Sequence, residues 1–387
     1  MSPPMTYHAW ARLALIALAF MLKLGAEAPG PLPPAAAAAV EAERAPAAGF
    51  LLDPENGVTV RLNGFAQARY TSVDFGAGGQ SFDLALVRLA LSGSAFDPKV
   101  GYFFQLETST FGDNNRLNML DAWLEYRPSE RLGLQAGRFL LPYSRQFYTH
   151  PGKLLFADLS AADYAFNLQR ALGVSGSGKV GRFSYSAAAV NSVRALDATG
   201  QRNAGGGLGA VARLEIDVLA PYGYLESAPR PAAEPQLSIG VAGGYNPVEE
   251  ASAFQNVLPG DRTWNSTGDA GFRWRRLSLQ AAVYHRQVQF AGLGGPRGND
   301  LGWYGQAGFL LAPQKWELAG RVAAVDFDRF NNPEALGDHI EYTVGVNRYL
   351  HGHNLKIQGD YSLVDLRQSH GAASHDHRVR GQFQILF

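Results

Sequence analysis

The charged residues that could do chemistry occupy alternate positions, between apolar residues, along most of the chain. This spacing puts them on one face of extended strands. Guanidinium groups on a water-facing surface bind anions, and an opposing row of carboxylates would orient dipolar solutes. The basic candidates are Arg61, Arg69, Arg88, Arg213, Arg273, Arg275, Arg286, Arg321, Lys356, Arg378 and Arg380. The acidic candidates are Glu107, Asp121, Glu125, Glu215, Asp217, Asp269, Glu317, Glu341 and Asp360. The two sets nearly balance, so the strands alone predict no strong field of one sign.

Other kinds of chemistry find little support in the sequence. It contains no nucleophile elbow, phosphate-binding loop or zinc-protease helix motif, and no cysteine for thiol catalysis or disulfides. His351 with His353, and His370, His375 and His377, could hold a metal, but they fall in an expected turn and an expected loop, where solvated histidines are the favoured interpretation. The sequence therefore predicts no enzyme and no cofactor.

The composition suits strands that separate lipid from water. Apolar residues make up 46% of the 387 residues, yet the mean hydropathy of -0.13 is too polar for a bundle of membrane helices. A barrel with one lipid-facing and one water-facing surface averages to such a value. The 34 basic and 34 acidic residues cancel, which gives no reason to propose nucleic acid as a partner.

From Val58 onward the hydrophobic period is two, and it continues to Phe387. The repeating segments are long enough to cross a hydrocarbon layer as tilted strands, which takes about 9–11 residues. Sixteen strands are predicted, at 58–74, 81–95, 99–111, 115–127, 131–140, 170–178, 182–191, 206–219, 236–246, 263–275, 277–290, 302–312, 315–327, 338–350, 354–366 and 376–387. The predicted fold class is therefore all-β, a sixteen-stranded antiparallel transmembrane β-barrel.

The connections between these segments alternate between short turns and longer polar stretches, as in outer-membrane barrels with short periplasmic turns and long external loops. The connection at 220–235 breaks the rule, because it should be a short periplasmic turn and instead carries four prolines. Two interpretations remain open, an insertion or a misplaced strand. Tyr and Trp residues near strand ends, including Trp274, Trp303 and Tyr349, suit the aromatic girdles at the headgroups.

The third external connection, residues 141–169, is the longest and is too apolar for an exposed loop. We expect it to fold into the barrel and narrow it. Its charged residues, with those at its ends, are Arg138, Arg145, Lys153 and Arg170 against Asp158 and Asp163. This modest positive excess predicts a preference for anions.

The two ends of the chain indicate export and membrane insertion. Arg12, an apolar run at 14–22 and the small-residue site Ala26-Glu27-Ala28 predict a signal peptide over 1–28, with a retained anchor as the alternative. Residues 29–57 are then a Pro- and Ala-rich linker, and 58–387 the barrel. In the last segment one parity is almost wholly apolar and the other carries Arg and Gln, and the segment ends in Phe387, a feature of outer-membrane barrels.

Four sequence runs resemble the phosphate-selective porin O and P family. They are VRLNGFAQ at 60–67, VRL at 87–89 followed by Ser92-Gly93, DAWLEY at 121–126 and AGRFLLPYS at 136–144, and together they support a resemblance over 58–387. The most specific piece is the G-R-F-x-x-P-x-S pattern that enters the third loop.

This resemblance implies a homotrimeric barrel in the bacterial outer membrane, with its third loop folded inward and passive uptake of small anions such as phosphate or polyphosphate through a ladder of arginines. We therefore expect outer-membrane lipids and small anionic or polar solutes as partners. The predicted anion-binding and pore-lining residues are Arg61, Arg69, Arg88, Arg138, Arg145, Lys153, Arg170, Arg286, Arg378 and Arg380. Lys153 is the single lysine of the third loop, whereas well-studied phosphate pores of the family have several.

Three other hypotheses are weighed against an anion pore. A general, non-selective porin fits the near balance of wall charges. A barrel enzyme would need a Ser with a nearby His on the lipid-facing parity, and no such pair is found. An adhesive barrel tethered by 29–48 ranks lower, because that region has no heptads or capped helix.

Overall fold

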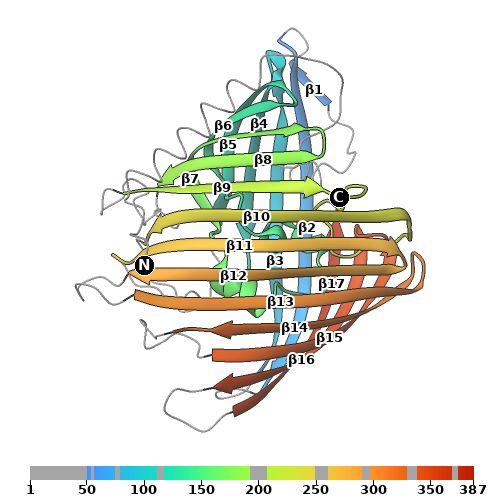
Figure 1. Ribbon diagram of the computed structural model, residues 1–387. Coiled ribbons are helices and arrows are strands. Elements are labelled where there is room, and N and C mark those ends of the chain that lie inside the picture. The colour runs from blue at the N-terminus through green and yellow to red at the C-terminus, as the bar shows by residue number, and fades with distance from the viewer. Residues whose placement is uncertain are drawn as a thin grey trace.

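The computed structural model describes residues 50–53, 56–74, 79–110, 117–191, 207–248, 260–289, 297–328, 338–367 and 374–387. Most of these residues lie in strands of one closed antiparallel barrel (Figure 1). The predicted signal peptide and most of the predicted linker lie outside the described residues. No helix in the described ranges is long and apolar enough to cross a membrane.

The barrel is built from sixteen strands, each antiparallel to its neighbours in sequence. They are β2 (Val58–Val73), β3 (Gly79–Ala95), β4 (Asp97–Thr108), β5 (Asn118–Ser129), β6 (Leu132–Leu140), β7 (Arg170–Val180), β8 (Phe183–Asn191), β9 (Leu208–Asp217), β10 (Ala232–Pro247), β11 (Arg262–Arg275), β12 (Leu277–Gln289), β13 (Arg297–Ala312), β14 (Trp316–Asp326), β15 (Asp338–His351), β16 (Leu355–Arg367) and β17 (Ser374–Leu386). The predicted fold class and strand count are confirmed.

The last strand closes the barrel against the first. β17 pairs with β2, with Arg380 opposite Thr71. Gly64 and Phe387 exchange two backbone hydrogen bonds of 2.8 and 2.9 Å, so the carboxyl-terminal residue completes the seam. A closed barrel satisfies every strand edge, which is what a lipid environment requires of strands.

Two strands begin four or more residues before their predicted starts, and one strand was not predicted. β10 begins at Ala232 instead of 236, because a register shift and Pro235 interrupt the alternation that marks a strand. β13 begins at Arg297 instead of 302, where its polar residues hide the period. β1 (Phe50–Asp53) lies in the predicted linker, pairs with the start of β2 and is too short for a periodic signal.

Side chains alternate between the interior and the exterior of the barrel, as the period of two predicts. In β2, Asn63, Gln67 and Arg69 are buried, whereas Leu62 is 50% exposed. In β17, Arg380 is buried and Phe383 is exposed. The polar parity therefore faces the enclosed space, here called the lumen, and the apolar parity faces outward toward lipid.

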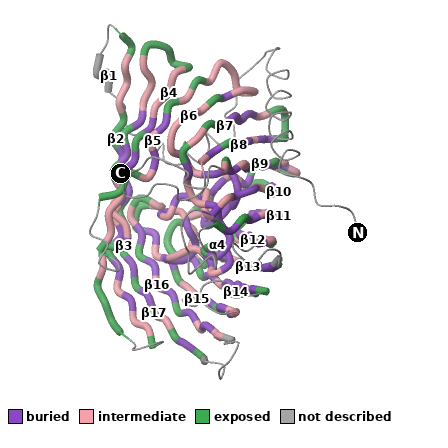
Figure 2. Tube along the Cα trace, turned by 90° about the vertical axis from the view of Figure 1, so that its left-hand side faces the viewer, coloured by how far each residue is buried: buried purple, intermediate pink, exposed green. Residues whose placement is uncertain are grey.

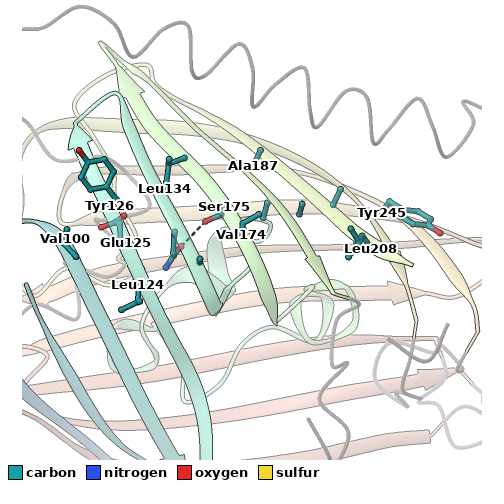
Figure 3. Close-up of a pocket in the computed structure, with 16 residues that line it drawn as sticks. Val100, Leu124, Glu125, Tyr126, Leu134, Val174, Ser175, Ala187, Leu208 and Tyr245 are labelled. Carbon is teal, nitrogen blue, oxygen red and sulfur yellow. Dashed lines mark hydrogen bonds between the residues drawn. The ribbon is translucent and has the colours of Figure 1, made fainter. Parts of the chain in front are cut away.

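The outward surface of β5 to β9 is an apolar groove, lined by Leu124, Leu134, Val174 and Leu208 (Figure 3). Such a surface is suited to acyl chains. Trp274, Trp303, Trp316 and Tyr342 are likewise exposed, as expected for girdle residues.

Tyr349 was wrongly predicted for the aromatic girdle. It is buried on the inward parity and donates a hydrogen bond to Glu317. Its position near a strand end suited a girdle, but the register of β15 turns it toward the lumen.

Three short helices belong to residues 141–169, hereafter called L3: α3 (Arg145–Tyr148), η2 (Pro151–Lys153) and α4 (Ala161–Phe166). Figure 2 shows α4 within the ring of strands. Tyr143 and Phe166 of L3 pack in one buried cluster with wall residues Trp123, Tyr284 and Tyr304. The main hydrophobic core therefore lies inside the barrel, between L3 and the wall.

We expect Gly137→Ala to reduce the yield and thermal stability of the folded barrel. Gly137 has φ +131, and an added Cβ would overlap the backbone of Ala122 and Trp123 in the neighbouring strand. Forcing a side chain into such a conformation costs about 1–3 kcal/mol. The measurement is the temperature at which detergent-solubilised protein loses its heat-resistant gel mobility. Gly305→Ala is the matched control, because nothing lies within 4 Å of its added Cβ. Equal midpoints for both variants would contradict this account.

Candidate pore constriction

L3 enters the lumen through locally encoded turns. The Ser144 hydroxyl accepts from the Phe147 N–H at the start of α3, and the Ser160 hydroxyl accepts from the Asp163 N–H at the start of α4. These N-caps satisfy amide groups that a short helix leaves unpaired. The N-caps do not determine how deep L3 enters the lumen or which part of the wall it contacts. Both depend on contacts with strands that are remote in sequence.

The first anchor of L3 is a buried quartet of two arginines and two carboxylates. The Arg145 guanidinium from α3 lies 2.6 Å from Asp269 and 3.0 Å from Glu215. Arg213 lies 2.6 Å from Asp269 and 3.0 Å from the same Glu215 oxygen. Arg213 also donates to the carbonyl of Tyr143 at 3.0 Å. Buried charges are stable only when they are paired in this way, so the quartet fixes α3 against β9 and β11.

The second anchor joins the middle of L3 to the barrel seam. Asp158 accepts from Arg69 of β2 at 2.9 Å and from Arg380 of β17 at 2.5 Å. Arg69 also donates to the Ala157 carbonyl, and Asp360 accepts from the Ala157 N–H. Burial opposes ionisation, but the charges of Arg69 and Arg380 lower the pKa of Asp158 to about 2. Asp158 therefore remains an anion across the physiological range.

The third anchor holds α4. Arg286 of β12 donates to Asp300 of β13 and, at 3.0 Å, to the Ala165 carbonyl. Its guanidinium carbon lies 5.0 Å from the Phe166 ring centroid, a distance at which the ring quadrupole attracts a cation. Arg286 is buried on the inward parity, and its donors are turned to L3 and to a neighbouring carboxylate.

Wall side chains also hold the L3 backbone between these anchors. Lys356 donates to the Leu154 carbonyl at 3.0 Å, and Asn347 donates to the Leu155 carbonyl at 3.0 Å. Gln384 donates to the Gly152 carbonyl at 2.9 Å. Polar groups of the wall thus satisfy backbone acceptors that a strand-free segment inside a barrel would otherwise leave unpaired.

Three further predicted basic residues are paired with carboxylates of the wall. Arg88 lies 2.6 Å from Glu107, Arg170 lies 3.0 Å from Asp121 and Arg378 lies 3.1 Å from Glu341. With Arg69, Arg145, Arg286 and Arg380, seven of the ten predicted anion-binding residues have a carboxylate partner.

The other three predicted residues occupy different environments. Arg61 is exposed on the inward parity near the start of β2. Lys153 is half-buried at the end of η2. Arg138 pairs in register with Ala122 and Leu172, which places it on the outward parity and away from the lumen. Its place at the end of the third loop made it a candidate pore residue, but only the strand register shows which face it occupies.

The sequence did not predict the basic partners of two lumen carboxylates, or that the segment containing Glu226 enters the barrel. Arg127 pairs with Glu125, and Lys179 lies 2.8 Å from Asp217. Arg127 and Lys179 lie near strand ends, on the inward parity, so the period of two could have identified them as lumen residues. Glu226, in the connection that breaks the short-turn rule, accepts from the Leu155 N–H of L3 at 2.9 Å. The prolines of that connection indicated an irregular segment but not its direction.

Asp163 is a buried carboxyl group of L3 whose charge depends on pH near neutrality. Burial raises the pKa of Asp163 to about 7, against hydrogen bonds from Ser144 and Tyr284 that favour the anion. The Tyr284 hydroxyl lies 2.9 Å from the carboxylate. Protonation of Asp163 therefore changes the charge inside the L3 packing in a physiological range.

The histidines do not assemble into a metal site among the described residues. His353 shares a hydrogen bond of 3.1 Å with the Ser227 carbonyl, and His377 stacks on Tyr361. His375 is exposed and His370 lies outside the described ranges. In the part of the chain that the structure describes, no group of three or more His, Cys, Asp or Glu side chains could hold a metal ion.

The predicted positive excess concerned L3 and its ends, and the buried charges of the interior as a whole do not continue it. Among the described residues, the buried charged side chains are eight basic and twelve acidic. The arginines of the wall are therefore compensated, and the lumen carries no uniform positive field.

A closed sixteen-stranded barrel with an apolar exterior, and a polar interior narrowed by a long inward segment, defines an outer-membrane porin. The sequence matches the family described as phosphate-selective porin O and P over residues 58–387. The chain belongs to that family, which is one of channels, and its location is the bacterial outer membrane.

Solved structures show the same fold at low sequence identity. The chain is similar to OmpF of Salmonella typhi in complex with daunomycin, with 13% identity, a TM-score of 0.60 and coverage of 88% of this chain and 100% of that one. It is similar to an anion-selective porin from Comamonas acidovorans, with 14% identity, a TM-score of 0.58 and coverage of 85% and 100%. It is also similar to the outer-membrane channel DcaP of Acinetobacter baumannii, with 12% identity, a TM-score of 0.60 and coverage of 88% of this chain and 100% of that one. No curated protein sequence matches.

We expect Asp158→Asn to increase anion preference. The substitution removes the charge that compensates Arg69 and partly compensates Arg380, where the carboxylate is still partly open to solvent. The chloride-to-potassium permeability ratio should rise roughly threefold, which corresponds to ~0.7 kcal/mol. Reversal potentials in a salt gradient measure it. Asp326→Asn, which removes an exposed charge at the end of β14, is the control and should leave the ratio unchanged.

We expect Asp163→Asn to reduce the pH dependence of stability. The pKa of Asp163 is about 7 in the folded protein against an ordinary value of 3.8, so its proton stabilises the fold fully below pH 3.8 and this stabilisation is lost as pH rises through 7. The neutral amide has no such proton to lose. Thermal midpoints measured at about pH 5 and about pH 8 should differ less for the variant than for the wild type. An unchanged difference would show that another group titrates.

Proposed function

We propose that the chain is a passive diffusion porin for small polar solutes, anions included, rather than a pore with a dedicated phosphate site. The observation that carries this proposal is that seven of the ten predicted anion-binding residues are paired with carboxylates. A carboxylate that compensates the charge of an arginine weakens its attraction for a phosphate oxygen, and the donors bound to that carboxylate must be released before they can bind the anion.

Small anions are included because the family is described as phosphate-selective and one relative in structure is described as an anion-selective porin. Paired rows of arginine and carboxylate produce local fields without a large net charge, which orient dipolar solutes in a narrow passage. This arrangement supports weak charge preference.

The proposal includes a homotrimer. The family resemblance implies it, and the OmpT structure of Vibrio cholerae, 9% identical to this chain, is described in a trimer form. Its test is the molar mass of the detergent-solubilised protein by light scattering, corrected for bound detergent. A monomeric mass that persists at high protein concentration would contradict the trimer.

Single-channel recording of the refolded protein in planar bilayers tests the proposed transport. We expect steady current, a chloride-to-potassium permeability ratio below about tenfold (~1.4 kcal/mol) and no block by added phosphate. A strong anion preference with current that falls as phosphate is added would favour the phosphate-pore hypothesis and contradict the proposal. Complete absence of current would contradict both.

A further inference from the structure

The connection between β9 and β10, residues 218–231, differs from the other turns described at the same end of the barrel. Those turns occupy one to three residues, at 96, 130–131, 181–182, 276, 313–315 and 352–354. The longer connection also does not lie in solvent. Tyr222, Tyr224, Glu226 and Ser227 are buried, and none exceeds 6% exposure.

Closing the sheet does not require these residues. Asp217 and Ser238 are already opposite each other in the β9–β10 ladder, and a two-residue turn is enough to join paired antiparallel strands. Ordering extra residues inside a barrel has an entropic cost that their contacts must offset. The contacts of 218–231 therefore indicate what the segment does.

One set of contacts fixes the segment to the inner wall. The Tyr222 ring lies 4.3 Å from the guanidinium carbon of Arg273, and its backbone N–H donates to Ser238. The ring occupies the space above Gly271, where any side chain would overlap it. Tyr224 donates to Glu215 at 3.0 Å, which joins the segment to the arginine quartet of the wall.

A second set joins the segment to L3. The Gly223 carbonyl accepts from Arg145 at 3.2 Å. The carboxylate of Glu226 accepts from the Gln146 side chain at 2.7 Å and from the Leu155 N–H at 2.9 Å, so one buried group contacts L3 on both sides of η2. The Ser227 N–H donates to the Lys153 carbonyl at 3.4 Å.

A third set reaches a part of the rim several strands away. The Pro229 carbonyl accepts from the Gln314 N–H at 2.7 Å, in the turn between β13 and β14. The Ser227 carbonyl lies 3.1 Å from Nε2 of His353, in the turn between β15 and β16. The segment thus leaves β9, meets L3 within the barrel and reaches the turns of β13–β16 before it returns to β10.

We propose that residues 218–231 form a second constriction, on the short-turn side of L3, and that Glu226 positions it by joining it to L3. The short-turn end of an outer-membrane barrel is the periplasmic end, so a solute that passes L3 meets this segment before it leaves. The inference goes beyond the proposed function, because the size limit then depends on two segments from opposite ends instead of on L3 alone.

The test compares the single-channel conductance of three full-length variants with the wild type. The first replaces 218–231 by Asn-Gly, which keeps all of β10 and leaves eight residues between Asp217 and Ser238 to connect the two strands. Its conductance should rise roughly twofold, as expected when one of two similar constrictions in series is removed. The second, Glu226→Ala, should raise conductance and open-channel noise because the joint to L3 is lost. Glu234→Ala is the matched control, since that glutamate is exposed at the start of β10.

Glu226→Gln distinguishes a role of Glu226 in positioning the 218–231 segment from a role in the stability of the barrel alone. Its amide oxygen can still accept from the Leu155 N–H, whereas the second carboxylate oxygen, which accepts from Gln146, is lost. Its conductance should therefore lie closer to the wild-type value than that of Glu226→Ala, even if its thermal midpoint shifts. The size of excluded polyethylene glycols, measured on the same channels, should increase for the shortened variant and for Glu226→Ala only. If the shortened variant does not fold, the comparison of Glu226→Ala with Glu226→Gln and Glu234→Ala decides the question.

Each outcome distinguishes the constriction from the proposed passive pore. Wild-type conductance and polymer exclusion in Glu226→Ala and in a folded shortened variant would overturn the constriction while leaving the pore intact. A silent wild type with a conducting shortened variant would contradict the passive pore and support the constriction. No current from any folded protein would contradict both.

Discussion

The position of L3 inside the barrel depends on charge compensation between L3 and the barrel wall. A lumen narrowed by protein is poorly hydrated, and a guanidinium group deprived of water needs a carboxylate or carbonyl oxygen in its place. Arg69, Arg145 and Arg286 each meet that requirement with a carboxylate, and Arg69 and Arg286 add an L3 backbone carbonyl. The same interactions hold L3 in one position, so wall charge and pore geometry depend on each other.

This dependence explains why basic residues alone are a weak guide to selectivity. A row of arginines attracts anions when their donors face water, but most of the inward arginines here face acids from nearby strands or from L3. Selectivity then depends on which pairs stay accessible and how easily they open. The ion pairs of Asp158 with Arg69 and Arg380 stay accessible, because the Asp158 side chain is partly exposed. The quartet around Asp269 is buried.

The interior is also organised from both ends. L3 enters between β6 and β7, the 218–231 segment enters between β9 and β10, and they meet at Glu226 and at Arg145. Each supplies partners for the other's buried groups, since the Gly223 carbonyl accepts from Arg145 and Glu226 accepts from L3 amides. Two irregular segments can therefore be ordered inside a barrel whose wall has already satisfied its own backbone groups.

The period of two determined the sixteen strands, their inward and outward faces and the closed barrel, because alternation is a local property that each strand carries itself. The apolar content of 141–169 likewise marked a segment unsuited to an exposed loop. Tertiary structure alone decided which charges meet, since Asp158 finds Arg380 across more than two hundred residues of chain. It also turned Arg138 outward and Tyr349 inward through strand register. Pairing and register depend on where remote strands come to lie, and a single segment of sequence does not contain that information.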